Sequence, residues 1–273
     1  MSIKGKTVGF VGAGNMGEAL IKGLLTAGLV PTAAVVATDV RAERLGQLER
    51  QYGIQTCPDI RELVGRADVL ILAVKPQVMT AVLREIAPGV TARTLLVSIA
   101  AGVPTARLRA ELPAGVRLVR VMPNTAALVL EAATAIAKAD GLHAGDLETV
   151  QEIFGAVGKV VVLDEELMDA VTALSGSGPA YVALVIEALA DGGVNMGLDR
   201  ATAMTLAVQT VLGTARLLLE TGLHPGQLKD MVASPGGTTM AGVAALEDGG
   251  LRRALIGAIE RATRRSQELG RSG

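Results

Sequence analysis

The sequence predicts an α/β fold in which a doubly wound, mainly parallel sheet is followed by a second, all-helical domain. Two patterns predict it. Up to about residue 163, short β-branched runs alternate with helical stretches, which is typical of βαβ units. From residue 164 onward the strand signal stops and only helical patterns remain. We therefore expect two domains, 1–163 and 164–273.

Charge and aromatic content exclude several classes of partner. The 273-residue chain has a net charge of −1 and a pI near 6.2, so neither nucleic acid nor an anionic membrane is an expected partner. Aromatic residues make up 1% of the chain and Trp is absent, which argues against a base-stacking surface for single-stranded nucleic acid. These features favour a small-molecule role.

Cysteine and hydropathy patterns indicate a cytoplasmic protein. Cys57 is the only cysteine, which excludes an internal disulfide framework and a cysteine-based metal cluster and agrees with a reducing compartment. The sequence enters a strand pattern at once, without a basic-then-apolar leader. Mean hydropathy is +0.44, but the longest uncharged segment, 170–186, contains Ser-Gly-Ser-Gly-Pro and would span a bilayer poorly. We attribute the apolar excess to buried helix surface.

The glycine-rich turn after the first predicted strand, 7–11, is the first functional signal. Gly12 permits a tight turn, Gly14 lets backbone N–H groups approach a pyrophosphate, and Gly17 lets the next helix pack on the strand. The N-terminus of that helix carries a partial positive charge, which suits a phosphate anion. The motif predicts a Rossmann-type nucleotide site; the alternative is an ordinary strand-to-helix turn.

Asp39 follows the second predicted strand, 34–38, at the place where an acidic side chain usually accepts hydrogen bonds from the adenine ribose of NAD. That position favours NADH. Arg41 and Arg44 stand beside it and could pair with a 2′-phosphate, as NADP sites require, so the coenzyme choice stays open. In the alternative interpretation, Asp39 caps the helix predicted over 41–52.

Further predicted strands bring three more loops to the same edge of the sheet. The strands are expected at 69–73, 94–99, 116–121, 134–137 and 160–162. Lys75 follows the first of them and is either a solvated charge or a cation near the nicotinamide ribose or phosphates. Small residues at 98–102 would let a flat ring approach the backbone, and 120–125 form a similar loop. Together with the glycine turn, these loops predict one crevice.

The second domain is predicted to contain helices over 166–196, with an interruption near 176–179, and over 199–220, 226–231, 240–246 and 251–269. Residues 181–190 are apolar nearly all round, which in a soluble protein implies burial on every side. A helical domain this thin cannot easily cover that segment alone. We therefore expect an extensive subunit interface, with a homodimer as the minimal unit.

A Pro-Gly-Gly turn between the last helices, 233–240, carries two hydroxyl groups into a helix N-terminus. Free N–H groups, a favourable dipole end and hydroxyl donors are what an anion needs, and the glycines remove the steric obstacle. The turn thus favours carboxylate binding over a plain helix cap.

These motifs together resemble the pyrroline-5-carboxylate reductase family along the whole chain. The resemblance is carried by Gly9–Leu20 (GFVGAGNMGEAL), Ala73–Pro76 (AVKP), Ala100–Gly102 (AAG), Arg120–Thr125 (RVMPNT), Asp169–Tyr181 (DAVTALSGSGPAY), His224–Asp230 (HPGQLKD) and Ser234–Thr239 (SPGGTT). The last three motifs are far more specific than the glycine fingerprint, because other Rossmann-type dehydrogenases lack them.

The resemblance implies reduction of 1-pyrroline-5-carboxylate to L-proline by hydride transfer from NADPH or NADH, the last step of proline synthesis. It also implies a helical domain that forms an intertwined dimer. Whether such dimers assemble further into a larger ring is not fixed by the resemblance. The implied cofactor contacts, with Arg41 added from its position, are Val11, Gly12, Ala13, Gly14, Asn15, Met16, Thr38, Asp39, Arg41, Val74, Lys75, Pro76, Ile99, Ala100 and Ala101. The implied substrate contacts are Glu165, Gly236, Gly237, Thr238 and Thr239.

Thr239 and Glu165 are the predicted catalytic residues. A partly protonated imine accepts hydride without a strong acid, so no catalytic histidine and no metal are required. Glu165 could favour the cationic iminium and Thr239 could hydrogen-bond the ring nitrogen, while the backbone of 236–239 holds the carboxylate.

The chain departs from the family pattern at two places. It has Thr-Asp-Val-Arg at 38–41 where many relatives place Asn or Ser with Arg, which puts the usual NADPH preference in doubt, and Asp59 where relatives often have Asn.

Two rival functions differ in testable features. A hydroxy-acid dehydrogenase would carry a catalytic lysine early in the helical domain, and 169–181 contains none. A non-catalytic NAD(P) sensor would not need Glu165 and the full 234–239 turn.

Overall fold

The computed structural model describes residues 3–271, which pack into two compact units. The sheet unit comprises the residues up to Ser177 and those from Arg261 onward, and the helical unit is Gly178–Glu260. The boundary predicted after residue 163 lies at the end of the last strand. The sheet unit therefore also takes in the segment 164–177 and the final turns of the chain.

A single sheet of eight strands organises the sheet unit within the described residues. Its strands are β1 (Val8–Val11), β2 (Val35–Thr38), β3 (Gln55–Thr56), β4 (Val69–Leu72), β5 (Leu95–Ser98), β6 (Arg117–Met122), β7 (Ala132–Ala137) and β8 (Gly158–Leu163). The seven predicted strands are all present. The two-residue strand β3 was not predicted, because so short a run carries no periodicity.

The strand order, β3-β2-β1-β4-β5-β6-β7-β8, is that of a doubly wound sheet. All neighbours pair in parallel except β6 and β7, which are antiparallel. The chain builds outward from β1 in one direction as far as β3 and then resumes at β4 on the other side of β1. The carboxyl ends of β1 and β4 therefore form a switch point, which is where ligands bind in sheets of this kind.

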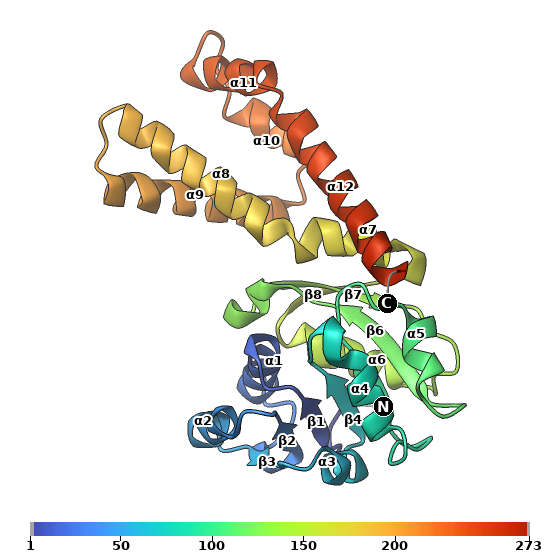
Figure 1. Ribbon diagram of the computed structural model, residues 1–273. Coiled ribbons are helices and arrows are strands. Elements are labelled where there is room, and N and C mark those ends of the chain that lie inside the picture. The colour runs from blue at the N-terminus through green and yellow to red at the C-terminus, as the bar shows by residue number, and fades with distance from the viewer. Residues whose placement is uncertain (1–2, 272–273) are drawn as a thin grey trace. The chain divides into compact units, whose positions relative to one another are not determined.

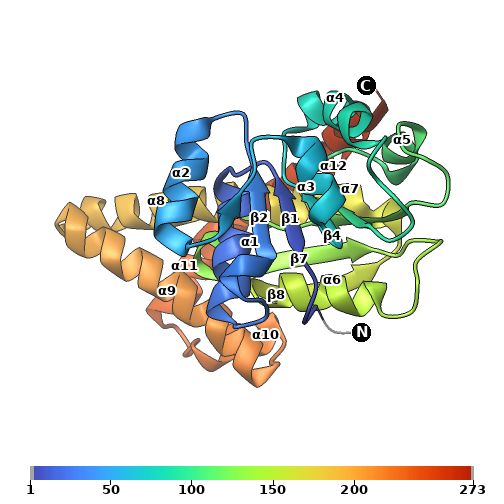
Figure 2. The same ribbon diagram turned by 90° about the horizontal axis from the view of Figure 1, so that it is seen from below.

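Helices cover both faces of the sheet. They are α1 (Asn15–Thr26), α2 (Ala42–Tyr52), α3 (Ile60–Arg66), α4 (Pro76–Ile86), α5 (Thr105–Ala110), α6 (Asp146–Gly155) and α7 (Met168–Val171). Apolar side chains of α1, α2 and α6 join one buried cluster, and those of α3, α4 and α5 join the other. Figure 2 shows α1 and α6 on one side of the strands and α3, α4 and α5 on the opposite side. Both faces of the central strands are thus buried.

Short irregular helical turns complete the sheet unit. They are η1 (Thr32–Ala34), η2 (Thr125–Val129), η3 (Glu165–Leu167) and the π-helical turn η4 (Thr172–Gly176). The last turn accounts for the interruption predicted near 176–179, since the regular helix resumes only after it. The end of the chain also packs here, with the Ser266 hydroxyl donating to Asp169 Oδ1 at 2.6 Å.

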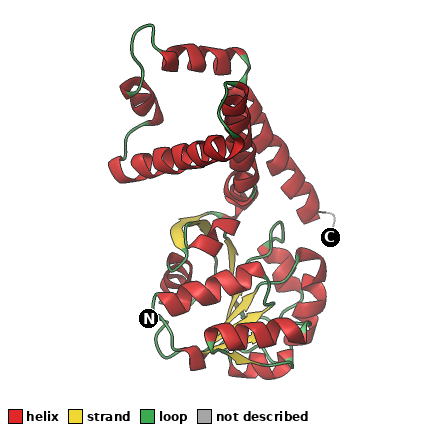
Figure 3. Ribbon diagram, turned by 90° about the vertical axis from the view of Figure 1, so that its left-hand side faces the viewer, coloured by secondary structure: helices red, strands yellow, loops and turns green. Residues whose placement is uncertain are grey.

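The helical unit is built from α8 (Gly178–Asn195), α9 (Arg200–Thr221), α10 (Pro225–Met231), α11 (Thr238–Asp248) and the first part of α12 (Leu251–Arg271). Strands are confined to the sheet unit in the part of the chain that the structure describes (Figure 3). Asp199 caps α9 by accepting from the Thr202 N–H, and Gly222 ends it with φ +67°. The predicted helices of this unit are all present, with ends within two residues of those expected.

Helices α8 and α9 lie side by side (Figure 1) and bury only a few small residues against each other. Ala190, Ala203 and Ala207 form that contact, whereas Leu184 of α8 is 66% exposed. By length and composition alone, two segments of the described chain could cross a membrane, Glu165–Asn195 and Arg200–Thr221. The same property is expected of helices that a second subunit covers.

Candidate active site

The glycine turn between β1 and α1 has the geometry that its sequence predicts. Gly12 adopts φ +98°, and a Cβ at this position would lie 2.6 Å from the Ala73 carbonyl oxygen. A Cβ at Gly17 would lie 2.5 Å from the Gly12 carbonyl oxygen. Neither position can accept a side chain without moving the backbone, so both glycines are needed for the close packing of strand, turn and helix.

The space over Gly14 is open. A Cβ built on this residue meets no atom within 4 Å, although Gly14 is the N-cap of a twelve-residue helix. Glu18 makes the first helical hydrogen bond, to the Gly14 carbonyl at 2.9 Å, so the preceding N–H groups of Asn15, Met16 and Gly17 point out of the helix end. An unobstructed backbone surface with outward N–H donors fits the pyrophosphate of a dinucleotide.

A cavity of about 280 Å³ lies beside this turn, at the carboxyl ends of the strands. Its walls come from Met16, Ala73, Val74, Lys75, Ile99, Met122, Pro123, Asn124, Thr125 and Gly176. The structure therefore brings the glycine turn and the three predicted loops to one cavity. Of the predicted cofactor contacts, Met16, Val74, Lys75 and Ile99 line it directly.

The remaining residues predicted for these loops lie close by but do not line the cavity. Pro76 is the first residue of α4, where a proline is well accommodated. Ala100 is buried beneath the loop after β5, and Ala101 is exposed on its outer side. Of the loop after β5, Ile99 is therefore the residue that lines the cavity, and the small residues predicted to admit a flat ring do not.

Asn124 and Gly176 complete the cavity and were not predicted as site residues. The Asn124 amide donates to the Ser175 carbonyl at 3.0 Å and accepts from the Ala133 N–H at 3.2 Å, so it ties the π-helical turn to the sheet. A Cβ at Gly176 would lie 2.5 Å from Met122 Cε. Both residues belong to motifs noted in the sequence, but only the fold shows that 120–125 and 172–176 meet.

Asp39 lies at the end of β2 beside the glycine turn. Its carboxylate accepts from the Ala13 N–H at 2.9 Å and from the Arg41 N–H at 3.0 Å, and Arg41 Nε lies 3.2 Å away. Burial disfavours the charged form, but these hydrogen bonds and the Arg41 charge outweigh it and lower the pKa of Asp39 below its ordinary value. The N-cap of α2 is Arg41 and not Asp39.

Thr38 precedes Asp39 and is buried in the sheet. Its carbonyl accepts from the Gly12 N–H at 2.9 Å, which joins the end of β2 to the glycine turn. The residues predicted for the adenine-ribose end of the site, Thr38, Asp39 and Arg41, thus adjoin the turn predicted for the pyrophosphate.

Glu165 lies at a different cavity of the sheet unit, one of about 290 Å³. Its Oε1 accepts from the Thr105 N–H at 2.6 Å and lies 3.2 Å from Nη1 of the buried Arg120. Although burial opposes ionisation, the hydrogen bonds from Thr105 and the Arg120 guanidinium lower the pKa of Glu165. The carboxylate is thus the counter-ion of a buried arginine, and it does not line the cavity beside the glycine turn.

The Pro-Gly-Gly turn opens α11 in the helical unit. Gly236 has φ +65°, the Gly237 N–H donates to the Ser234 carbonyl at 2.9 Å, and Gly237 is the N-cap without a side-chain cap. The exposed Thr238 begins the helix. The Thr239 hydroxyl donates to the Val232 carbonyl at 2.9 Å, which directs the lone pairs of Oγ1 away from that carbonyl.

Metal ligands do not gather anywhere in residues 3–271: no group of three His, Cys, Asp or Glu side chains is placed to hold an ion.

Comparisons with known proteins identify related sequences along the whole chain. A family model for pyrroline-5-carboxylate reductase dimerisation matches residues 165–269, and one for coenzyme F420-dependent NADP oxidoreductase matches residues 7–102. A pyrroline-5-carboxylate reductase of Methanosarcina acetivorans is 50% identical over 269 residues, which are 98% of this chain and 100% of the relative. The corresponding protein of Escherichia coli is 40% identical over 267 residues, 98% and 99% of the two chains.

Solved structures that are similar to this chain include members of the same family. A pyrroline-5-carboxylate reductase from Coxiella burnetii is 36% identical, with a TM-score of 0.92 and coverage of 97% of this chain and 98% of that one. The pyrroline carboxylate reductase of Plasmodium falciparum, solved with NADP bound, is 31% identical, with a TM-score of 0.88 and coverage of 98% and 99%.

Proposed function

The chain belongs to the pyrroline-5-carboxylate reductase family, and from that premise we propose how its residues reduce 1-pyrroline-5-carboxylate to L-proline with NAD(P)H. When bound, the cofactor supplies a hydride to the C=N carbon of the substrate. The protein supplies binding, orientation and electrostatics. The observation that carries the proposal is the cavity beside the glycine turn, at the point where the strand order reverses.

The cofactor lies, in this proposal, along the edge of the sheet from the end of β2 to the loop after β5. The N–H groups at the start of α1 hold the pyrophosphate, and Asp39 with Thr38 and Arg41 meets the adenine ribose. Val74, Lys75 and Pro76 flank the nicotinamide ribose, while Ile99 forms the wall against which the ring lies and Ala100 and Ala101 shape the loop that carries it. Ile99 supports this, since it lines the cavity together with Met16 and Val74.

The substrate carboxylate is held at the start of α11 by the backbone N–H groups of Gly236 and Thr238, while Gly237, whose N–H donates to the Ser234 carbonyl, shapes the turn. This helix has eleven residues and its N-cap supplies no side-chain acceptor, so its first N–H groups are available to an anion. The positive φ of Gly236 turns the backbone so that the N–H groups follow one another at the turn.

Thr239 meets the ring nitrogen as a hydrogen-bond acceptor. Because its hydroxyl proton is donated to the Val232 carbonyl, Oγ1 presents lone pairs, and a protonated imine presents an N–H. The pairing therefore favours the iminium, the form that accepts hydride most readily. Orientation of the two reacting carbons supplies most of the remaining rate enhancement.

Glu165 contributes negative charge that favours the cationic iminium, and it acts without proton transfer. Its lowered pKa supports this role, since the carboxylate stays ionised at neutral pH. Its ion pair with the buried Arg120 means that Glu165 also has a structural role, which any substitution will disturb.

The functional assembly is, we propose, at least a homodimer formed through the helical unit, and pairs of subunits can extend into a larger ring. The exposed apolar surface of α8 and α9 supports this, because a second subunit would cover it. Subunit contact also accounts for the two segments that resemble membrane spans by composition. We propose a cytoplasmic location for the assembly.

The test is a spectrophotometric assay that follows NAD(P)H oxidation with pyrroline-5-carboxylate, comparing the wild type with Thr239→Ala and Thr239→Ser. We expect Thr239→Ala to lower kcat at least tenfold while the Kd for the cofactor stays within twofold, since the hydroxyl is proposed to contact the substrate and not the cofactor. Thr239→Ser keeps the hydroxyl and should recover most of the activity. Loss of cofactor binding with unchanged kcat at saturation would contradict the role given to Thr239.

A further inference from the structure

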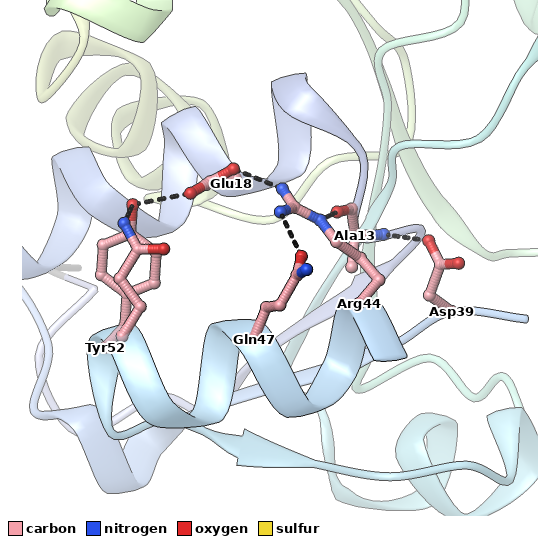
Figure 4. Close-up of polar contacts among 7 residues, drawn as sticks. Ala13, Glu18, Asp39, Arg44, Gln47 and Tyr52 are labelled. Carbon is pink, nitrogen blue, oxygen red and sulfur yellow. Dashed lines mark hydrogen bonds and ion pairs between the residues drawn. The ribbon is translucent and has the colours of Figure 1, made fainter. Parts of the chain in front are cut away.

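A cluster of polar side chains lies between α1 and α2 and joins both helices to the glycine turn (Figure 4). Its centre is Arg44 in the first turn of α2, and its outer members are Glu18 of α1 and Tyr52 at the end of α2. Ala13 of the glycine turn connects the cluster to Asp39. Its N–H donates to the Asp39 carboxylate, and its carbonyl accepts from Arg44. No step of the proposed reaction uses it.

Arg44 is one of the two cations that stand beside the expected adenine ribose, and its guanidinium is already occupied. Nε donates to the Ala13 carbonyl at 2.6 Å, Nη1 donates to Gln47 Oε1 at 3.3 Å, and Nη2 donates to Glu18 Oε2. The arginine and glutamate side chains are 17% and 20% exposed, so this contact is less screened by solvent than a surface pair. Arg44 therefore braces the glycine turn, and its charge is balanced within the cluster.

Tyr52 fixes the other oxygen of the Glu18 carboxylate. Its hydroxyl donates to Glu18 Oε1 at 2.9 Å and accepts from the Gln51 amide at 2.9 Å. Both carboxylate oxygens of Glu18 are thus engaged, one by Arg44 and one by Tyr52. Rotating Arg44 toward a ligand would break contacts at both ends of the guanidinium.

Asp39 presents the opposite charge at the neighbouring position. Its side chain is 9% exposed and is held by the Ala13 and Arg41 N–H groups, while the side chain of its partner Arg41 is 64% exposed. The ribose end of the site therefore presents a fixed carboxylate, one arginine paired with that carboxylate and one paired with Glu18. A 2′-hydroxyl can donate to the carboxylate, whereas a 2′-phosphate dianion would be repelled by it, would find Arg44 held by Glu18, and would have to compete with Asp39 for the exposed Arg41.

We propose that Asp39, together with the cluster of Glu18, Arg44 and Tyr52, which we call the brace, makes this enzyme selective for NADH over NADPH. This rests on the proposed cofactor site. Asp39 is the specificity-determining residue, and Glu18 and Tyr52 are positioning residues that hold Arg44 on the Ala13 carbonyl and away from a phosphate. The assignment explains why an arginine close to the ribose does not produce an NADP site in this chain.

The experiment measures the Kd of NADH and of NADPH by fluorescence titration without substrate, and it adds competition by adenosine 2′,5′-bisphosphate and by 5′-AMP. For the wild type we expect NADH to bind at least tenfold more tightly than NADPH. Asp39→Ser should move the ratio of the two Kd values at least tenfold toward NADPH, with adenosine 2′,5′-bisphosphate gaining on 5′-AMP to a similar extent.

The brace is tested in the Asp39→Ser background. Adding Glu18→Gln releases the charge of Arg44, so the ratio should move a further three- to tenfold toward NADPH, and Tyr52→Phe should move it in the same direction by less. The matched control is Glu43→Gln, which removes the same charge from an exposed position in the first turn of α2. We expect this control to leave the ratio within twofold.

Tighter binding of NADPH by the wild type would overturn the selectivity. An effect of Glu18→Gln no larger than that of Glu43→Gln would overturn the role of the brace, because the shift would then be a general charge effect. Equal weakening of both cofactors by Tyr52→Phe and Glu18→Gln would show a merely structural role. Failure of the wild type to bind either dinucleotide would instead refute the proposed cofactor site itself, so the two failures are distinguishable.

Discussion

The sheet unit and the helical unit bury their apolar side chains to very different degrees. Every residue of β1, β2, β4 and β5 is buried within one chain, and two large apolar clusters fill the two faces of the sheet. In the helical unit, α8 buries only Ala190 of its eighteen residues, and α11 buries none. The sheet unit has a complete core, whereas the helical unit has apolar surface that only another surface can complete.

Their ion pairs show the same contrast. Arg117 and Asp146 of the sheet unit pair at 2.6 Å with side chains 10% and 5% exposed. Arg216 and Glu220 of α9 pair at 2.9 Å with side chains 75% and 64% exposed. Buried charges are costly unless paired, while solvent screens exposed ones, so the first contact should matter for stability and the second very little.

The largest expected effect concerns the apolar surface of α8. Leu184→Glu places a charge at an exposed apolar position in the middle of this helix. If a second subunit covers it, the charge must be desolvated on association, and the association constant should fall by ~100-fold or more, about 3 kcal/mol. Sedimentation velocity across a concentration series measures the change.

The control for that prediction lies in the sheet unit. Ala110→Glu adds the same charge at an exposed position at the end of α5 and should leave the association constant unchanged. The Kd of NADH should be retained by both variants, because the proposed cofactor residues lie in the sheet unit. A Leu184→Glu protein that associates as tightly as the wild type would show that α8 is not the covered surface.

The next effect in size concerns the buried ion pair of the sheet unit. Asp146→Ala leaves Arg117 buried without its counter-ion, and we expect the free energy of unfolding in urea to fall by about 3–5 kcal/mol. Glu220→Ala in α9 is the matched control and should change it by no more than about 0.5 kcal/mol. Similar losses of unfolding free energy in the two variants would show that the buried ion pair of the sheet unit matters no more than the exposed pair of the helical unit.

The double variant Arg117→Met, Asp146→Leu sharpens the same test. Replacing both charges by apolar side chains should recover most of the stability lost in Asp146→Ala, since no uncompensated charge remains. Failure to recover would mean that the other contacts of these side chains carry the stability. Those contacts are the hydrogen bonds from Arg117 to the Arg93 carbonyl and from the His143 N–H to Asp146.

Substitutions in the glycine turn should have effects of intermediate size. One should mainly lower the free energy of unfolding, and the other should mainly raise the Kd of NADH. Gly17→Ala would force a Cβ to within 2.5 Å of the Gly12 carbonyl oxygen, so we expect a loss of about 1–3 kcal/mol in unfolding free energy. Gly14→Ala meets no atom within 4 Å and should cost less, about 0.5–1 kcal/mol, because Ala is a poorer N-cap than Gly. It should nevertheless raise the Kd of NADH about tenfold, because the new methyl group occupies the surface proposed for the pyrophosphate. Equal effects of the two substitutions on both quantities would contradict this division of roles.

Much of the fold was predictable because its signals are local. The seven predicted strands are β-branched runs bounded by turn residues, and the predicted helix from Asp199 begins at a clear N-cap residue. The strand β3 was missed because two residues carry no pattern. The antiparallel pairing of β6 with β7 could not be predicted from the sequence either, because it depends on how the segment between these two strands folds back.

The site was predictable only in part, for a related reason. The cavity residues Met16, Val74, Lys75 and Ile99 follow buried strands, and position after a strand is visible in the sequence. Asn124 and Gly176 could be recognised only in the structure, because they belong to segments that are distant in the sequence and line the same cavity in the fold. The brace on Arg44 likewise depends on α1 and α2 lying next to each other. The sequence indicated an arginine near the expected ribose position, but it did not indicate that Glu18 holds this arginine.

The smallest effect concerns Glu165 and how stability varies with pH. Burial opposes its ionisation, but Thr105 and Arg120 lower its pKa in the folded protein, so the ionised carboxylate contributes stability above the unfolded pKa of about 4.3. That contribution should be lost as the pH falls through the folded pKa. We therefore expect the difference in unfolding free energy between the wild type and Glu165→Gln to be constant from pH 7 to pH 5 and to shrink below about pH 4.3, where both side chains become neutral.

The same substitution at the exposed neighbour Glu166 controls for the loss of one negative charge, and its difference from the wild type should be smaller throughout. A difference for Glu165→Gln that stays constant down to pH 3 would mean that its amide disturbs packing, not charge. In that case Arg120 would not depend on Glu165 as its counter-ion, and a loss of activity in Glu165→Gln could reflect the disturbed packing as well as the proposed contact with the iminium. A difference that shrinks as expected would instead require every kinetic effect of this variant to be measured at a temperature well below its unfolding transition.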